Sequence, residues 1–328
     1  MSHEVVLVGA QDYFFDPVAE AVKAKGYTPV RYRSIAAFQE APHPLARAVV
    51  LYAVSACPVP REVMAAAPKL RAVISPWTGT EGFDEAAATE LGIVVGNGQV
   101  PENAESLAEA TVLMILACIY DFDGTRQRFR DHVWALPQLS ARMLKGKTVG
   151  LWGYGAIARG IVQRLAGWGV DFLATTRHPP AETSHPVRFL PLDDMLRASD
   201  VVCVLVPLAA ETRGMLDGRR LALMKRGSIL IGISRGGIID EAALIELASR
   251  GHFGAIGLDV YATEPLPPDS PIRALKNAVL TPHSVGLTQE SRRVQIAAGV
   301  DNVTRVLDGA PPIYVRNPEV LARWRPAP

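Results

Sequence analysis

Short runs of apolar, often β-branched residues alternate with helical patterns along most of the chain. In the first hundred residues the predicted strands are Val5–Val8, Pro29–Tyr32, Val49–Leu51, Ala72–Ile74 and Ile93–Val95. Stretches rich in Ala and Glu, such as Pro17–Lys25 and Glu85–Leu91, lie between them and favour helices. Because apolar strands that alternate with helices are typical of βαβ units, the pattern predicts an α/β fold with a parallel sheet covered on both faces.

The alternation stops after the first hundred residues and then starts again. Residues 101–120 predict a long buried helix with Asn103 as its N-cap, and an Arg- and Asp-rich loop follows to residue 142. Six more strands are predicted: Thr148–Trp152, Asp171–Thr175, Val201–Val206, Ser228–Ile233, Ala255–Asp259 and Ala278–Thr281. A last amphipathic helix, about 288–307 and closed by Gly309, favours a return to the first domain. We therefore expect two doubly wound parallel-sheet domains, one over 101–287 and one built from 1–100 and 288–328.

Composition narrows the possible partners and the compartment. The 328 residues include 34 Lys and Arg against 33 Asp and Glu, with no basic stripe, which argues against nucleic acid or an anionic membrane as a partner. The most apolar stretch, 104–120, is short for a membrane span and carries Glu105 and Glu109. Three cysteines give no disulfide framework, and the N-terminus lacks the features of a signal peptide. We expect a soluble protein of the reducing cytoplasm.

A glycine-rich turn lies between a predicted strand and a predicted helix. In the segment GYGAIA, Gly153 permits a tight turn, Gly155 lets the backbone approach a pyrophosphate, and Ala158 is small enough for the helix to pack on the strand. The N–H groups near Ala156 and Ile157, at the helix N-terminus, would bind the phosphates. The alternative is a glycine turn without a ligand.

The end of the second strand of this sheet bears on the choice of cofactor. An NAD site has an acidic residue there for the ribose diol, whereas this chain has Thr176 and Arg177. Arg177 would pair with a 2′-phosphate and Thr176 would donate a hydrogen bond to it. The sequence therefore favours NADP(H) over NAD(H), although Arg177 as a solvated loop residue is the alternative.

Three later segments each place a chemically suitable residue just past a strand, at the edge where open α/β sheets bind ligands. They contain Arg235, then Asp259 and Glu264, then His283. A planar guanidinium suits a 2-oxo acid, a histidine suits proton transfer near neutral pH, and a carboxylate beside the histidine favours its charged form. Taken singly, each could be an ordinary surface or loop residue. Their common position indicates an active site that transfers a hydride to or from C2 of a small acid, with no metal among its residues.

These motifs together resemble the D-isomer-specific 2-hydroxyacid dehydrogenases. The similarity runs from about residue 70 to 291 and includes LKGKTVGLWGYGAIA, VPLAAETRGML, GISRGGIIDEAAL, GAIGLDVYATEPLP and LTPHSVG. The resemblance implies that Arg235 binds substrate, that His283 is the acid/base and that Glu264 is its partner. It places Asp259 near the nicotinamide. The predicted cofactor contacts also include three residues at or just past the ends of predicted strands, namely Val206, Pro207 and Ile233.

The resemblance also implies which domain binds the substrate and which binds the cofactor. The backbone of Trp77, Thr78 and Gly79 falls where relatives hold the substrate carboxylate. The Rossmann domain, 101–287, would bind the cofactor and is inserted in a smaller, flavodoxin-like substrate-binding domain. The long helix after Asn103 resembles one that contributes to a dimer interface, so a homodimer is expected.

Within the family, the segment TTRHPP resembles the NADP-using glyoxylate/hydroxypyruvate reductases, while Trp77 and Thr78 stand where smaller residues are common. The expected substrate is therefore a small 2-oxo acid and its D-2-hydroxy acid, not further specified. Formate dehydrogenases carry glutamine where this chain has Glu264, and phosphite dehydrogenases use a lysine where Thr78 stands. The alternative from another class is a corepressor-like protein that binds NAD(H) without physiological catalysis.

Overall fold

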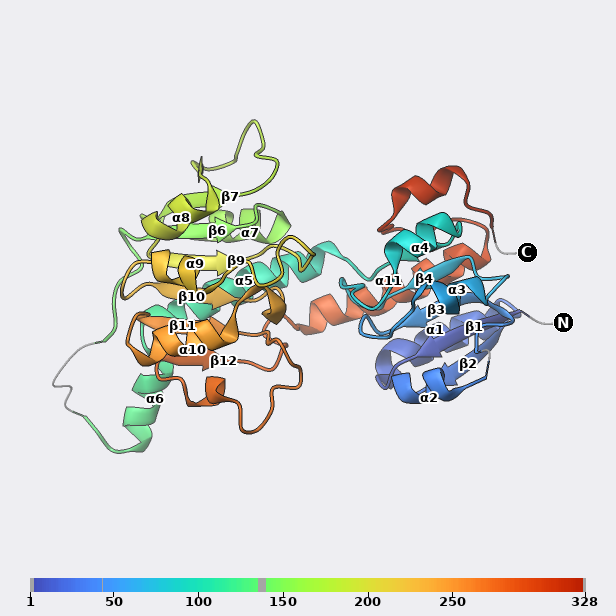
Figure 1. The fold of residues 1–328 in the computed structure, drawn as a ribbon, viewed down its shortest axis with the longest axis horizontal. Helices are drawn as coiled ribbons and strands as arrows, with labels where there is room; N and C mark the ends of the chain where they lie inside the picture. Colours follow the sequence, from blue (N-terminus) through green and yellow to red (C-terminus); the bar gives the residue numbers. More distant parts are fainter. Residues whose placement is uncertain (1–2, 43, 135–139, 327–328) are drawn as a thin grey trace. The chain divides into compact units, whose positions relative to one another are not determined.

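The computed structural model describes residues 3–42, 44–134 and 140–326. The chain forms two compact units (Figure 1). The first consists of Met1–Glu102 and Thr288–Pro328, and the second of Asn103–Leu287. The first unit is therefore built from both ends of the chain.

The first unit contains a five-stranded parallel sheet in the order β2-β1-β3-β4-β5. Its strands are β1 (Glu4–Val8), β2 (Thr28–Tyr32), β3 (Ala48–Ala53), β4 (Ala72–Ile74) and β5 (Val94–Gly96). Its helices are α1 (Asp12–Ala24), α2 (Ile35–Glu40), α3 (Arg61–Ala65), α4 (Glu85–Glu90) and α11 (Gln289–Leu307), followed by the 3₁₀ turn η3 (Pro318–Ala322). This order is that of flavodoxin-like domains, as predicted.

Both faces of this sheet are covered because its strands alternate two apolar sets. Val5 and Leu7 belong to the core shared with α1 and α11, whereas Val6 and Val8 belong to the core shared with α2, α3 and α4. All six residues of the central strand β3 are buried. The near-continuous apolar runs in the sequence reflect this two-sided burial.

The second unit contains a seven-stranded parallel sheet in the order β12-β11-β10-β9-β6-β7-β8. Its strands are β6 (Thr148–Trp152), β7 (Asp171–Thr175), β8 (Arg188–Phe189), β9 (Val201–Val204), β10 (Ile229–Gly232), β11 (Ala255–Leu258) and β12 (Ala278–Leu280). Its helices are α5 (Pro101–Ile119), α6 (Phe122–Arg130), α7 (Ala156–Leu165), α8 (Leu192–Ala198), α9 (Gly218–Leu223) and α10 (Glu241–Ser249), with the 3₁₀ turns η1 (Gly236–Ile238) and η2 (Pro271–Ala274). The strand order reverses between β6 and β9, which makes the sheet doubly wound and confirms the predicted fold class.

The structure differs from the predicted elements in the stretch around α5 and α6. Helix α5 begins at Pro101, so Asn103 lies inside its first turn and is not the N-cap; proline suits a first helical turn because its missing N–H is not needed there. The predicted loop after α5 contains α6, which starts after Asp121 adopts a left-handed conformation with φ of 49°. No residue of α6 is buried and its sequence is strongly polar, so it resembles a solvated loop. Residues 135–139 of that predicted loop lie outside the described residues.

Smaller differences occur at the ends of other elements. The second sheet has a seventh strand, β8, of only two residues. The last long helix ends at Leu307 with Asp308 as its C-cap, one position before the predicted cap Gly309, which follows the helix with φ of 81°. None of the helices described is both long enough and apolar enough to cross a lipid bilayer.

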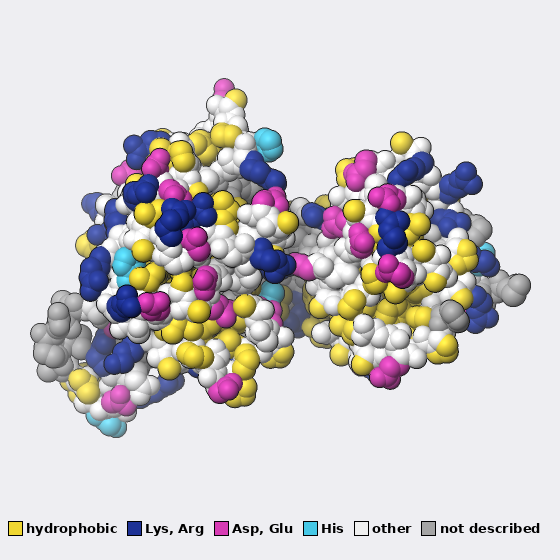
Figure 2. Space-filling model, viewed as in Figure 1, with side chains coloured by type: hydrophobic (Ala, Val, Ile, Leu, Met, Phe, Trp, Pro, Cys, Tyr) yellow, Lys and Arg dark blue, Asp and Glu magenta, His cyan; other side chains and the backbone are white. Residues whose placement is uncertain are grey.

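Charged side chains of both signs are interspersed over the face of each unit seen in Figure 2, in keeping with the near-neutral net charge. One charged group anchors the amino-terminal edge of the second sheet. Asp200, before β9, accepts hydrogen bonds from the Thr148 backbone N–H at 2.9 Å and from Lys225 at 2.9 Å. Burial raises the pKa of the Asp200 carboxyl, but these two donors outweigh burial and leave the pKa below its ordinary value.

Candidate active site

The glycine turn after β6 leaves room for a ligand beside the backbone. Gly153 has φ of 104°, and a Cβ there would lie 3.0 Å from the carbonyl carbon of Leu205. Gly155 is the N-cap of α7, and a Cβ there would meet no atom within 4 Å. The first position therefore needs glycine for its conformation, and the second has open space where a pyrophosphate could approach.

The start of α7 fits the binding of phosphate groups. Ala156 and Ile157 are its first two residues, whose N–H groups have no partner within the helix. Ala158 is fully buried in the core that contains α5 residues. A Cβ at Gly160 would lie 2.8 Å from the Cβ of Ala108 on α5. Small residues thus let α7 pack closely against α5, with the N-terminus of α7 just past the end of β6.

Past the end of β7, the predicted cofactor residue Arg177 has a partner that the sequence did not reveal. Its Nη1 lies 3.1 Å from Oε1 of Glu211, and the two side chains are 78% and 58% exposed. Glu211 lies in the loop after β9, which also contains the predicted cofactor residues Val206 and Pro207. A carboxylate is therefore present in space although none follows β7 in the sequence.

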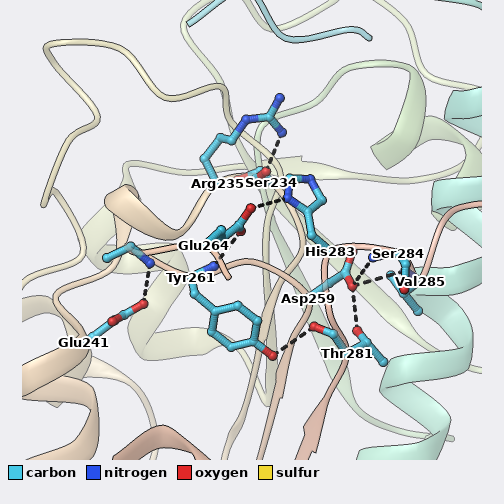
Figure 3. A network of polar contacts seen from close by, with 11 residues as sticks. Ser234, Arg235, Glu241, Asp259, Tyr261, Glu264, Thr281, His283, Ser284 and Val285 are labelled. Atoms are coloured by element: carbon cyan, nitrogen blue, oxygen red, sulfur yellow. Dashed lines mark hydrogen bonds and ion pairs between the residues drawn. The ribbon is translucent and has the colours of Figure 1, made fainter. Parts of the chain in front are cut away.

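The network in Figure 3 lies past the ends of three adjacent strands, β10, β11 and β12. His283 follows β12, and its Nδ1 lies 2.6 Å from Oε2 of Glu264, which comes from the loop after β11. The other oxygen of Glu264 accepts a hydrogen bond of 3.0 Å from the Tyr261 backbone N–H. The histidine and glutamate side chains are 44% and 34% exposed. The structure therefore brings together an imidazole and a carboxylate that are both partly exposed.

Asp259 holds the segment that carries His283. Its Oδ1 accepts hydrogen bonds from the Thr281 hydroxyl at 2.6 Å and from the backbone N–H groups of Ser284 and Val285 at 2.8 and 3.1 Å. The residue is only 2% exposed. His283 itself has φ of 52°, a left-handed conformation that a residue with a Cβ adopts at a cost. The structure thus gives Asp259 a positioning role for the His283 backbone.

Arg235 follows β10 and precedes η1, where the backbone approaches the Glu264 loop closely. A Cβ at Gly236 would lie 1.9 Å from the carbonyl carbon of Tyr261, so only glycine allows this contact. Nη1 of Arg235 donates to the Ser234 carbonyl at 2.7 Å. The Tyr261 hydroxyl donates to the Thr281 carbonyl at 2.9 Å, and burial raises its pKa. These contacts tie the segments after all three strands to one another.

The predicted substrate loop belongs to the first unit. The backbone N–H of Trp77 donates to the hydroxyl of Ser75 at 3.1 Å. The Trp77 ring meets the ring of Phe14 edge to face, with centroids 4.3 Å apart and planes at 82°. The indole is therefore held against α1 beside Thr78 and Gly79.

Two further observations concern a possible metal site and a cavity elsewhere in the structure. Among the described residues, no group of three or more His, Cys, Asp or Glu side chains is placed to hold a metal ion. A cavity of about 410 Å³ opens between α2 and α3 in the first unit, lined by residues such as Phe38, Leu45 and Val63. It contains none of the predicted site residues, so it is not the site that the motifs indicate.

Comparison with known proteins identifies the family. Residues 112–285 match the profile described as "D-isomer specific 2-hydroxyacid dehydrogenase, NAD binding domain". The chain is 37% identical over 275 residues to D-3-phosphoglycerate dehydrogenase from Mycobacterium tuberculosis, covering 83% of this chain and 50% of that one. It is 33% identical over 272 residues to glyoxylate reductase from Korarchaeum cryptofilum, covering 80% and 81% of the two chains. The chain belongs to the D-isomer-specific 2-hydroxyacid dehydrogenase family, as its motifs predicted.

Solved structures agree with this assignment. The fold matches an NADPH-dependent glyoxylate/hydroxypyruvate reductase from Sinorhizobium meliloti, solved with citrate, at a TM-score of 0.84 and 26% identity over 98% of this chain and 99% of that one. The chain spans about half the length of the phosphoglycerate dehydrogenases that it matches.

Proposed function

We propose that the protein is an NAD(P)-dependent oxidoreductase that interconverts a small 2-oxo acid and its D-2-hydroxy acid. The observation that carries the proposal is the 2.6 Å contact between Nδ1 of His283 and Glu264, at the sheet edge that also carries Arg235. An acid/base histidine oriented by a carboxylate is what protonation of an alkoxide requires. Family membership supports the same chemistry.

Each of the three residues has a task that its surroundings support. The guanidinium of Arg235 binds the substrate carboxylate and polarises the C2 carbonyl. Because Nδ1 of His283 donates to Glu264, the Nε2–H of the imidazolium is left to protonate the C2 oxygen during reduction. The neutral imidazole then regains a proton from solvent, and in the oxidation it removes the hydroxyl proton instead. The nicotinamide, when bound, supplies or accepts the hydride.

We propose NADP(H) as the favoured cofactor. The open side of Gly155 and the N-terminus of α7 suit a pyrophosphate, while Thr176 and Arg177 suit a 2′-phosphate. Because Arg177 already pairs with Glu211, a 2′-phosphate has to displace the Glu211 carboxylate in order to pair with Arg177. NAD(H) is therefore expected to be used as well, at lower efficiency.

The proposed substrate is an acid of the size of glyoxylate or hydroxypyruvate, bound by the backbone of Trp77, Thr78 and Gly79 together with Arg235. The names of the similar reductases support this size class. The test is a panel of small 2-oxo acids assayed with NADPH and with NADH. Reduction of glyoxylate or hydroxypyruvate with the higher kcat/KM for NADPH is expected. Absence of turnover across the panel would refute the activity, and an equal or higher value for NADH would refute the cofactor preference.

We also propose that the Asn103–Leu287 unit binds the cofactor, that the other unit binds substrate, and that the protein is a cytoplasmic homodimer. Along α5, α6 and the residues that follow, large apolar side chains are exposed, among them Leu113, Phe129 and Trp134. Such side chains support a protein interface. The three cysteines are free and buried, which suits a reducing compartment. The molar mass in solution tests the dimer, and a monomeric mass would contradict it.

A further inference from the structure

The two carbonyl groups of the substrate loop are both held from the same side. The carbonyl of Trp77 accepts a hydrogen bond of 2.9 Å from the backbone N–H of Gly98. The carbonyl of Thr78 accepts one of 2.7 Å from the side-chain amide, Nδ2, of Asn97. Both donors follow directly after β5.

This anchoring fixes where the next N–H groups point. In a planar trans peptide the N–H of one residue is directed opposite to the carbonyl of the residue before it. The Gly79 N–H is therefore directed away from Asn97, and the Thr78 N–H away from Gly98. Both N–H groups are thus directed away from residues 97–98, and neighbouring N–H groups of this kind suit the two oxygens of a carboxylate.

We propose that Asn97 is a positioning residue for substrate binding, which acts by holding the Thr78 carbonyl so that the Gly79 amide faces the substrate carboxylate. This inference rests on the proposed function of the loop. Asn97 itself does not touch the substrate. Its side chain orients the peptide group between Thr78 and Gly79, and that peptide group contacts the substrate.

Asn97 is itself firmly held, which a positioning residue requires. It is 1% exposed, and its carbonyl accepts a hydrogen bond of 3.0 Å from Nδ2 of Asn302, a fully buried residue of α11. The backbone N–H of Asn97 donates to the Tyr314 carbonyl at 3.2 Å. A Cβ at Gly98 would lie 2.0 Å from the Pro76 carbonyl oxygen, so the two segments touch through backbone atoms. The anchor is rigid on both sides.

The chain offers a matched control for a purely structural role. Asn317 is also buried, at 2% exposure, in the same unit and beside the same strand. Its side chain accepts from the Val95 N–H at 2.8 Å and donates to the Ile93 carbonyl at 3.0 Å. The hydrogen-bond partners of its side chain among the described residues are Val95, Ile93 and Thr89, which lie outside the substrate loop, so its loss should lower stability without turning the Gly79 amide.

The experiment compares Asn97→Ala, Asn97→Asp and Asn317→Ala in the full-length protein, at a temperature where circular dichroism shows all three folded. Oxalate, an unreactive dicarboxylate, is the probe, and its Kd is measured calorimetrically with saturating NADPH. KM and kcat for glyoxylate are measured in parallel. Asn97→Asp keeps the shape of the side chain but replaces the donor with an acceptor that faces a carbonyl.

Both Asn97 variants should raise the oxalate Kd and the glyoxylate KM roughly tenfold or more, because one hydrogen bond to a charged group is misaligned. Asn317→Ala should leave the Kd and KM within about twofold while lowering Tm. Equal effects of Asn97→Ala and Asn317→Ala, or no oxalate binding to the unmodified protein, would overturn the inference. Oxalate binding that depends on Asn97 in a protein without turnover would support the inference and refute the proposed activity.

Discussion

The hydrogen bonds to Asp259 make a quantitative prediction about the His283 segment. One buried carboxylate oxygen accepts three hydrogen bonds, two of them from the backbone N–H groups of Ser284 and Val285. Asp259→Ala would leave these donors buried without an acceptor, and each bond to a charged group contributes on the order of 1.5–3 kcal/mol. Since such contributions are not additive, we expect the free energy of local unfolding of the His283 segment to fall by roughly 3 kcal/mol. Asp259→Asn retains an acceptor in the same place, so this free energy should fall by only about 1 kcal/mol.

The local readout is hydrogen–deuterium exchange of a peptide that spans residues 281–287. In Asp259→Ala the amides of Ser284 and Val285 should lose protection, and kcat should fall roughly a hundredfold, because 1.4 kcal/mol corresponds to a factor of ten in rate. For Asp259→Asn, both the amide protection and kcat should lie between the values of the wild type and of the alanine variant. Wild-type protection and kcat in the alanine variant would show that the carboxylate does not hold the histidine, and the positioning role would be abandoned.

Three further predictions follow from single contacts. Glu211→Gln should free Arg177 from its carboxylate partner and raise the ratio of kcat/KM for NADPH over NADH several-fold; an unchanged ratio in steady-state assays would remove Glu211 from cofactor selection. Because the folded-state pKa of Asp200 lies below its ordinary value of about 4, its stabilising effect is present above that pH and lost as pH falls. Asp200→Asn should therefore lower Tm at pH 7, and the difference in Tm should shrink as the pH falls below about 4 through the lower folded-state pKa. A pH-independent difference would contradict this. Gly236→Ala should displace Arg235 and lower kcat/KM about a hundredfold or more, and wild-type kinetics would show that the close backbone approach is not required.

The strands and the residues at their ends were predictable because both leave local signals. Buried parallel strands are apolar throughout, and Arg235, Glu264 and His283 each follow such a strand within six residues. The contact between Glu264 and His283 joins loops after adjacent strands, so parallel topology alone brings their segments to the same edge.

What the sequence did not reveal depends on contacts between distant segments or on short elements. Helix α6 is strongly polar and buries none of its residues, and β8 is only two residues long, so neither stands out as an apolar segment. The partner of Arg177 lies 34 residues away in another loop. The roles of Gly236 and Asn97 rest on a neighbouring backbone that only the folded structure supplies, although a paired glycine after Arg235 was a usable signal.

Proton transfer by His283 is the centre of this account, and one substitution tests it most directly. In His283→Ala, kcat for glyoxylate reduction should fall by about a hundredfold or more, while the Kd for NADPH, measured by fluorescence titration, stays at the wild-type value. His185→Ala, in the loop before β8, serves as the control and should retain full activity. Retention of kcat within a few-fold in His283→Ala, with cofactor still bound, would contradict the assignment of the acid/base.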